Sequence, residues 1–274
     1  MNRNWERYRE RTIFLLLREE TRLNYNSRGF ILRQRDYRDS DKLLSIFTEQ
    51  KGKITAVAKG IKKPKSSLRA CAQPFCHAYF HLNQGREMDL LTQGRLLDFY
   101  ANSRSDLERS LYCIYLMELL DKSLMENTPL PGLYHALLEV LTAINEQGLN
   151  PLFIRYFEVR LLANLGYKPV LSQCISCNRK AAAGFGFSLS EGGLVCPACQ
   201  GEANDAINVS GETLGILRLL SEGSFQTLPR VKASPGGLKE IEYLLEKYLE
   251  YHLDRRFKLK NTIRLLKKTI HFEN

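Results

Sequence analysis

Two closely spaced pairs of cysteines constrain the fold of this chain more than any other feature. Cys174 and Cys177 form one Cys-x-x-Cys turn, and Cys196 and Cys199 form a second after 18 further residues. Each turn can direct both sulfurs at one metal ion, and the segment between them folds back to complete a tetrahedral site. Because four thiolates leave no open coordination position, we expect one structural zinc ion in a zinc ribbon at residues 171–205. The alternative is four reduced cysteines with a structural role only.

The rest of the composition is typical of a folded protein that does not enter a membrane. Hydrophobic residues make up 44% of the 274 residues and charged residues 26%, which excludes disordered and collagen-like classes. The longest apolar run near the start, residues 13–17, is much shorter than the roughly 20 residues of a membrane span. Arg18, Glu19 and Glu20 stand where a signal peptide would have its cleavage site. We therefore expect a cytoplasmic protein, in which seven cysteines indicate metal binding or burial rather than disulfides.

The positive charge of the chain is concentrated in its N-terminal third. The whole chain carries a formal net charge of +10. Residues 1–83 contain 18 Lys and Arg against 8 Asp and Glu, whereas residues 84–274 contain 22 of each kind. A localised positive field favours a polyanionic partner, either nucleic acid or an anionic membrane surface.

Residues 28–102 have the pattern of a small β-barrel. Five short apolar runs separated by turns predict strands near residues 30–32, 43–48, 54–58, 74–82 and 88–100. Five strands in about 75 residues fit an oligonucleotide-binding (OB) fold, although an SH3-like barrel has the same number. Residues 1–27 precede the barrel as an N-terminal extension, and we expect residues 24–27 to form a loop.

Beyond residue 102 the pattern becomes helical. We expect a helical domain in two parts, residues 103–170 and 206–274, with the zinc ribbon inserted between them. Ser105 and Glu108 have the spacing of a capping box, Asn150 precedes a proline at a helix start, and Gly166 follows a helix end. The predicted fold class is therefore α+β multidomain, with an N-terminal five-stranded OB-fold β-barrel and an α-helical C-terminal domain with an inserted four-cysteine zinc ribbon.

A basic loop after the third predicted strand is the candidate nucleic-acid site. Residues 59–69 contain five basic residues and no acidic one. A flexible basic loop on a small barrel would follow a phosphate backbone while aromatic side chains stack on bases. With basic residues of adjoining strands and turns, the predicted DNA-contacting set is Arg33, Arg35, Lys53, Lys59, Lys62, Lys63, Lys65 and Arg69. The aromatic candidates, each of which could instead pack in the core, are Phe30, Tyr37, Phe47, Tyr79 and Phe80.

A second basic group and an acidic turn leave two further hypotheses open. Seven basic residues between positions 255 and 268 could extend the DNA track or be a solvated helix end. Asp36, Asp39 and Asp41 could bind Mg²⁺ in a nuclease, but the basic residues between them favour a salt-bridged turn. The sequence contains no phosphate loop, nucleophile elbow or H-E-x-x-H motif, so we expect no catalytic residues and no enzyme.

Several short motifs occur in the order in which they occur in the bacterial RecO recombination mediators. Between residues 28 and 268 the chain resembles this family, whereas residues 1–27 depart from it because the family normally begins near the first strand. The motifs are Tyr37, Asp41 and Leu43-Leu44, then Phe47-Thr48, Gly52 and Ala58-Lys59-Gly60, then Gln73-Pro74-Phe75, Leu165-Gly166-Tyr167-Lys168-Pro169, Cys174 with Cys177, and Gly192-Gly193-Leu194-Val195-Cys196 with Cys199.

The resemblance implies a DNA repair and recombination mediator that binds single- and double-stranded DNA and anneals complementary strands. With the partner RecR, such a protein helps load RecA onto single-stranded DNA coated by single-stranded-DNA-binding protein (SSB). The resemblance also implies that the helical domain engages the C-terminal tail of SSB, that Lys59 and the following loop contact DNA, and that the protein is cytoplasmic and nucleoid-associated. The rival hypotheses are a zinc-ribbon RNA-binding or transcription-associated module and a metal-dependent nuclease.

Overall fold

The computed structural model describes residues 23–182, 184–202, 205–254 and 263, which form two compact units. The barrel unit comprises the described residues up to Phe99 together with Leu124–Pro129. The helical unit comprises Tyr100–Ser123 and the described residues from Leu130 onward. The expected extension at residues 1–22 and the basic group at residues 255–268 lie outside the described residues.

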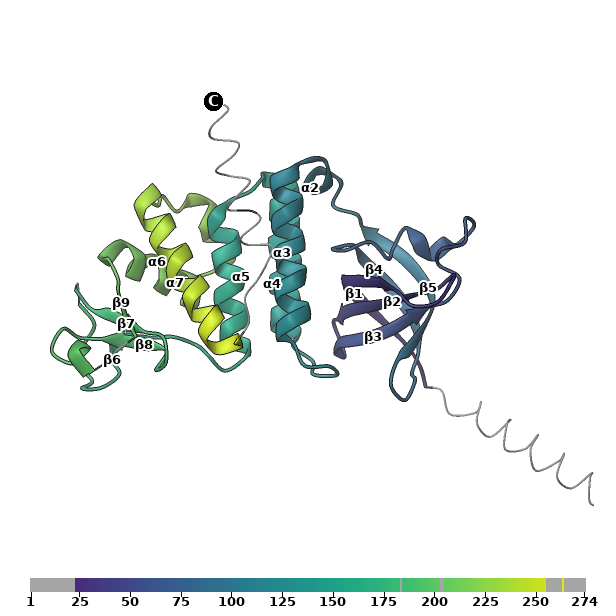
Figure 1. Ribbon diagram of the computed structural model, residues 1–274. Coiled ribbons are helices and arrows are strands. Elements are labelled where there is room, and N and C mark those ends of the chain that lie inside the picture. The colour runs from purple at the N-terminus through teal and green to yellow at the C-terminus, as the bar shows by residue number, and fades with distance from the viewer. Residues whose placement is uncertain (1–22, 183, 203–204, 255–262, 264–274) are drawn as a thin grey trace, which may run out of the picture. The chain divides into compact units, whose positions relative to one another are not determined.

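The barrel unit is a closed five-stranded barrel (Figure 1). Its strands follow one another around the barrel in the order β1-β2-β3-β5-β4. All neighbouring strands are antiparallel except β3 and β5, which are parallel. This closure is that of an OB fold, so the predicted barrel is confirmed. The strands are β1 (Asn24–Asp36), β2 (Lys42–Thr48), β3 (Gly52–Ala58), β4 (His77–Asn83) and β5 (Asp89–Asp98).

The loop expected at residues 24–27 is wrong, because these residues begin β1. Asn24 pairs with Asn83 and Ser27 with Phe80, so their backbone groups belong to the ladder between β1 and β4. The turn-like composition of this segment predicted a loop, but pairing with a strand more than 50 residues away overrides local preference. The expected extension therefore contributes four residues to the barrel.

The barrel core is filled from every strand and from the segment between β3 and β4. Burial alternates along β3, where Ile54, Ala56 and Ala58 point inward. The inter-strand segment contains a short 3₁₀ helix, η1 (Ser67–Arg69), and adds buried residues to the same core. The segment packs closely against Gly94 of β5, where a Cβ atom would lie 2.4 Å from Sγ of Cys71. Glycine at this position thus allows the segment to seal one end of the barrel.

The helical unit is built around α5, which lies between α4 and α7 (Figure 1). Most residues of α5 are buried. Helix α5 packs against α4, α6, α7 and the 3₁₀ helix η3. None of the described helices is both long enough and apolar enough to cross a bilayer. The helices are α2 (Ala101–Ser105), α3 (Leu107–Ser123), α4 (Pro131–Gln147), α5 (Pro151–Asn164), α6 (Gly211–Glu222) and α7 (Pro235–Leu253), and η3 is Phe225–Arg230.

Two of the three predicted helix ends are confirmed. The Asn150 side chain accepts a hydrogen bond from the backbone N–H of Leu152 at 2.9 Å, as an N-cap does. Gly166 has a φ of +91°, and the N–H of Tyr167 donates to the carbonyl of Leu162, which together form a Schellman end. The capping box at Ser105 is wrong, because Ser105 ends α2 and Asp106 caps α3 through the N–H of Arg109 at 2.8 Å.

A small sheet lies between α5 and α6 in the chain, where the zinc ribbon was predicted. Its four strands are ordered β6-β8-β7-β9, and a 3₁₀ turn, η2 (Gln200–Glu202), precedes the last strand. The strands are β6 (Val170–Cys174), β7 (Gly186–Ser188), β8 (Gly193–Val195) and β9 (Ala206–Asn208). The predicted insert in the helical part of the chain is therefore confirmed.

Candidate nucleic-acid interface and metal centre

The basic loop is anchored across one end of the barrel. We call this end, formed by the end of β1, the start of β2 and residues 59–76, the barrel mouth. Ile61 and Leu68 of the loop, and Ala72 just after it, are buried in the barrel core. The N–H of Lys62 also donates to the carbonyl of Ser40 at 3.0 Å. The apolar residues of the loop thus pack in the core, while its lysines face solvent.

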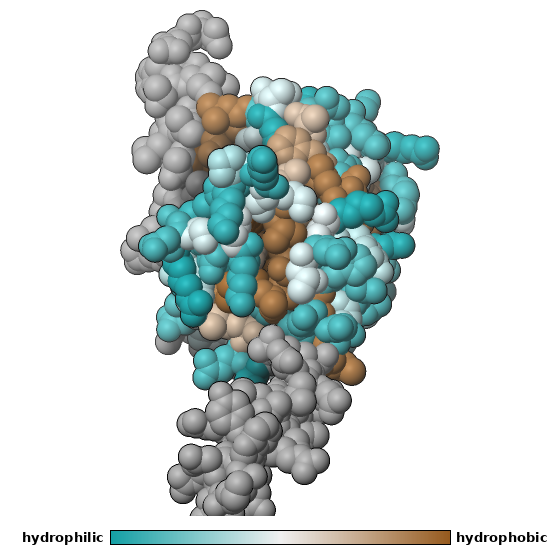
Figure 2. Space-filling model, turned by 90° about the vertical axis from the view of Figure 1, so that its right-hand side faces the viewer, coloured by the Kyte–Doolittle hydropathy of each residue, from teal (hydrophilic) through white to brown (hydrophobic). Residues whose placement is uncertain are grey.

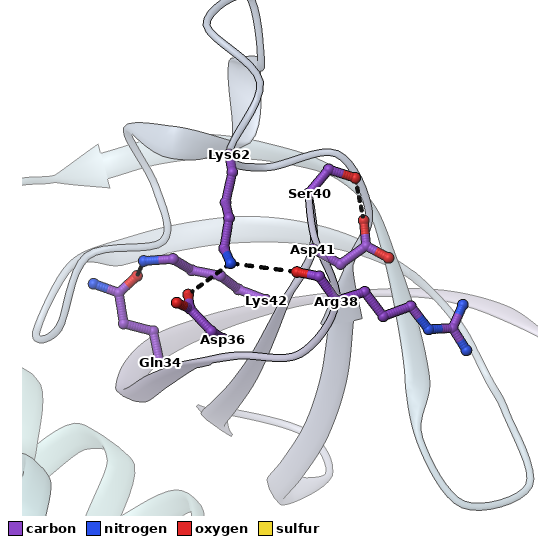
Figure 3. A network of polar contacts seen from close by, with 7 residues as sticks. All are labelled: Gln34, Asp36, Arg38, Ser40, Asp41, Lys42 and Lys62. Carbon is purple, nitrogen blue, oxygen red and sulfur yellow. Dashed lines mark hydrogen bonds and ion pairs between the residues drawn. The ribbon is translucent and has the colours of Figure 1, made fainter.

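Asp41 ties the loop to the turn between β1 and β2. Its carboxylate accepts a hydrogen bond from the N–H of Gly60 at 2.7 Å. It also accepts one from Oγ of Ser40 at 3.2 Å (Figure 3). The hydrogen bond from Gly60 is the main reason why the pKa of Asp41 lies below its usual value; burial opposes this shift, while Ser40 and the charges of Arg38 and Lys59 add to it. Asp41 is thus a positioning residue for the loop.

The acidic turn does not form a metal site. Asp36 makes an ion pair with Lys62 at 3.1 Å (Figure 3). Asp41 accepts hydrogen bonds from Gly60 and Ser40. Within the described ranges, the cysteine cluster is the group of His, Cys, Asp or Glu side chains close enough to hold a metal ion. The salt-bridged turn that the sequence favoured is therefore present, and this geometry gives no support to a metal-dependent nuclease.

Most of the predicted DNA-contacting residues lie around the barrel mouth. Arg33 and Arg35 alternate along β1 and are both exposed, so they share its outer face. The loop residues are exposed on the same end of the barrel, and hydrophilic side chains stand out over much of the face seen in Figure 2. These loop residues are Lys59, Lys62, Lys63, Lys65 and Arg69.

Lys53 lies at the opposite end of the barrel. Lys42 pairs with Ala58 at the mouth, whereas Lys53 pairs with Phe47 near the other end of the same hairpin. Six residues of strand separate Lys53 from Lys59, which is about 20 Å at roughly 3.3 Å per residue. The carbonyl of Lys53 also accepts a hydrogen bond from the N–H of Asn127 at 2.8 Å. The structure therefore divides the predicted set and leaves Lys53 apart.

Three of the five aromatic candidates are core residues. Phe30, Phe47 and Phe80 have no exposed surface and cannot stack on a base. Tyr37 is 39% exposed, and the guanidinium of Arg38 lies 5.1 Å from its ring centroid. Tyr79 is half-buried. The strand pattern of the sequence could have distinguished the buried rings from Tyr37. The buried rings lie within strands, whereas Tyr37 lies in the turn after β1.

Sequence reasoning missed a polar recess at the barrel mouth. Gln34 and Lys42 occupy inward-facing strand positions, because they pair with the core residues Leu44 and Ala58. Gln73, which is distant in sequence, lies beside Gln34. The sequence did contain a signal for this recess. Two neighbouring strands each have a polar residue at an inward-facing position, where a hydrophobic residue is expected.

The four predicted cysteines converge on one point. Their sulfur atoms all lie within 4.8 Å of one another, and Sγ of Cys177 is 3.6 Å from Sγ of Cys196. Tetrahedral coordination with Zn–S bonds of about 2.3 Å places sulfurs roughly 3.8 Å apart. Cys174 and Cys196 are buried, whereas Cys177 is exposed. The cluster can therefore bind a metal ion with four sulfur ligands.

The chemistry of the donor set also fits a bound cation. Burial of Cys174 opposes ionisation, but hydrogen bonds from backbone N–H groups, first that of Cys196, outweigh it and lower the pKa of Cys174 to about 6. The pKa of Cys199 is raised to about 12, chiefly by its hydrogen bond with Cys196. Four adjacent thiols thus cannot all ionise on their own, and a divalent cation would compensate their charge.

Comparison with known families accounts for both units. The family model described as "Recombination protein O N terminal" matches residues 22–100, and "Recombination protein O C terminal" matches residues 104–261. A protein of Syntrophomonas wolfei subsp. wolfei, named DNA repair protein RecO, is 52% identical over 244 residues, covering 89% of this chain and 97% of the relative. Relatives of the same name from Symbiobacterium thermophilum and Bacillus pumilus are each 32% identical. Their matches cover 89% and 90% of this chain, and 98% of each relative.

Proposed function

Because the chain belongs to the RecO family of DNA repair proteins, we propose that it acts as a recombination mediator. In this role it binds single- and double-stranded DNA and anneals complementary strands. With RecR it helps load RecA onto single-stranded DNA coated by SSB, and the helical unit engages the SSB tail. A cytoplasmic location at the nucleoid follows from this role.

The observation that carries the proposal is the grouping of basic side chains at the mouth of an OB barrel. Duplex formation is downhill once the repulsion between two phosphate backbones is screened, so annealing needs neither a catalytic residue nor nucleotide hydrolysis. Cations fixed on an anchored loop can supply this screening. We assign the contacts to Arg33, Arg35, Lys59, Lys62, Lys63, Lys65 and Arg69, all of which lie in β1 or the loop.

We further propose that Cys174, Cys177, Cys196 and Cys199 hold one structural zinc ion. The sulfur separations support tetrahedral coordination, and a donor set made of thiolates alone favours zinc over harder metals. An ion with four protein ligands has no position for substrate or water. It would hold together the β6–β9 sheet, in which three of the four strands have only three residues each.

Strand annealing tests the proposed function. Complementary oligonucleotides coated with SSB are mixed with the full chain in low salt, without ATP or Mg²⁺, and duplex formation is followed by fluorescence. We expect annealing to be faster than in the control without protein. DNA binding without acceleration would contradict the mediator role, and a preference for structured RNA over single-stranded DNA would instead favour an RNA-binding module.

A further inference from the structure

A recess opens at the barrel mouth, within the barrel unit. It has a volume of about 220 Å³, below the roughly 300–1,000 Å³ of pockets that hold whole small molecules. Ile61 and Ala72 are buried and form its apolar floor. The recess therefore suits a single chemical group rather than a complete cofactor. Its lining residues are Gln34, Lys42, Ile61, Lys62, Arg69, Ala72 and Gln73.

The polar walls of the recess present mainly hydrogen-bond donors. Nζ of Lys42 donates to Oε1 of Gln34 at 2.8 Å (Figure 3). Nε2 of Gln34 in turn donates to Oε1 of Gln73 at 3.4 Å. Each carboxamide oxygen thus has a donor already. The amide nitrogen of Gln73 and the remaining hydrogens of Lys42 stay available to a ligand. This arrangement selects a ligand that accepts hydrogen bonds.

The charge of the lining points the same way. Lys42, Lys62 and Arg69 contribute three cations, and the lining contains no carboxylate. Among the described residues, no hydrogen bond or ion pair engages the guanidinium of Arg69. The Asp36 carboxylate, whose side chain is 74% exposed, is 3.1 Å from Nζ of Lys62, which also donates to the carbonyl of Arg38 at 3.3 Å. Asp36 can therefore leave Lys62 for solvent when another anion arrives.

We propose that this recess binds one phosphate group, with Lys42, Lys62 and Arg69 around it and Asp36 as the anion it displaces from Lys62. The inference rests on the proposed function, because the phosphate is that of a nucleic-acid strand. Charge-assisted hydrogen bonds are stronger than neutral ones, and the recess lets three cations act on one phosphate together. Phosphate contacts of this kind set the register of a strand on a protein. The recess thus positions the strand, while Lys63 and Lys65 screen charge beside it.

Equal losses of charge inside and outside the recess provide the test. The double variant Lys42→Gln/Arg69→Gln removes two cations from the recess, and Lys63→Gln/Lys65→Gln removes two from the adjacent loop. Glutamine removes the charge and keeps a hydrogen-bond donor. Affinity for a single-stranded oligonucleotide is measured with the full chain over a range of salt. We expect the recess variant to bind on the order of tenfold more weakly than the loop variant, and Asp36→Asn to bind more tightly than the parent.

Several controls keep the result specific. Melting temperatures show whether the variants fold. If the double variant does not fold because of Lys42→Gln, Arg69→Gln alone is used as the recess variant. Oligonucleotides with a 5′-phosphate or a 5′-hydroxyl distinguish the sources: equal affinity assigns an internal phosphodiester, and preference for the phosphorylated end assigns a terminal phosphate. If the recess and loop variants lose the same affinity for the oligonucleotide, the phosphate site in the recess is wrong, but the proposal that the protein binds DNA stands.

Failure of DNA binding in the parent would be a different result, because it rejects the proposed function. Inorganic phosphate then decides the fate of the recess. If phosphate raises the melting temperature of the parent more than chloride does at equal ionic strength, and not that of the recess variant, the recess binds phosphate from another source. If it stabilises neither protein, the inference fails together with the proposed function.

Discussion

The cysteine cluster and the barrel mouth differ in how closely their functional side chains are grouped. The cluster takes four ligands from two short turns, and all four sulfurs lie within 4.8 Å of one another. The mouth takes its cations from β1, β2 and a long loop, and most of them point into solvent at separate places. A closed coordination shell depends on every member, whereas screening by dispersed cations is close to a sum of small terms. Single substitutions should therefore have large effects in the cluster and small ones at the mouth.

The largest effect is expected for Cys177→Ser. We predict loss of the bound zinc and unfolding of the β6–β9 sheet, because structural zinc sites contribute several kcal/mol or more to folding. Since Cys177 is exposed, lost packing cannot explain such an effect. Metal content and the melting curve are measured, with the neighbouring Ser176→Ala as the matched control. A Cys177→Ser protein that keeps one equivalent of zinc and the parent melting temperature would contradict the four-cysteine site.

The second prediction concerns the summed effect at the mouth. Replacing Lys59, Lys62, Lys63 and Lys65 with alanine should weaken single-stranded DNA binding and reduce the slope of log affinity against log salt by about 3, or roughly 0.7 for each phosphate that is no longer neutralised. The binding isotherm is measured at several salt concentrations, with four exposed lysines or arginines of the helical unit replaced as control. An unchanged slope would place the DNA-binding residues elsewhere, for example at the basic residues beyond position 254.

The same contrast explains what could be predicted from sequence. The cap at Asn150 and the helix end at Gly166 depend on neighbours within a few residues, and the cysteine ligands lie in two short motifs of recognisable spacing. The structure contains the cap, the helix end and the clustered sulfurs. The barrel was predictable because strand periodicity is also local. The segment at residues 24–27 was not, because it becomes a strand only by pairing with β4.

The recess shows the limit most clearly. Gln34 and Gln73 meet although 39 residues separate them, and neither belongs to a motif that predicts their approach. Their approach depends on the bulge in β1 after Ile31 and on the way the loop folds back over the core. The division between Lys53 and the mouth likewise requires the register of β2 with β3. Such features follow from tertiary pairing, which composition and spacing do not specify.

The third prediction tests whether Asp41 holds the basic loop in place. Its pKa is lowered in the folded protein, so it contributes stability above its unfolded pKa of about 3.9, and this contribution is lost as the pH falls through the folded value. The parent should therefore lose more unfolding free energy between pH 6 and pH 2 than Asp41→Asn does. Denaturant unfolding across that range measures the difference, with Asp39→Asn as the control. Identical pH profiles for the parent and Asp41→Asn would remove this role.

The smallest effect is expected for Lys53→Ala. If binding depends on the mouth, removing a cation about 20 Å from Lys59 should change DNA affinity less than Lys59→Ala does, because exposed charges farther apart than a Debye length of about 8 Å are largely screened. Both single variants are titrated with the same oligonucleotide at physiological ionic strength, and their melting temperatures are compared because the carbonyl of Lys53 holds Asn127. Equal losses of affinity at equal stability would show that the strand runs along the whole hairpin, and the functional division between Lys53 and the mouth would then be wrong.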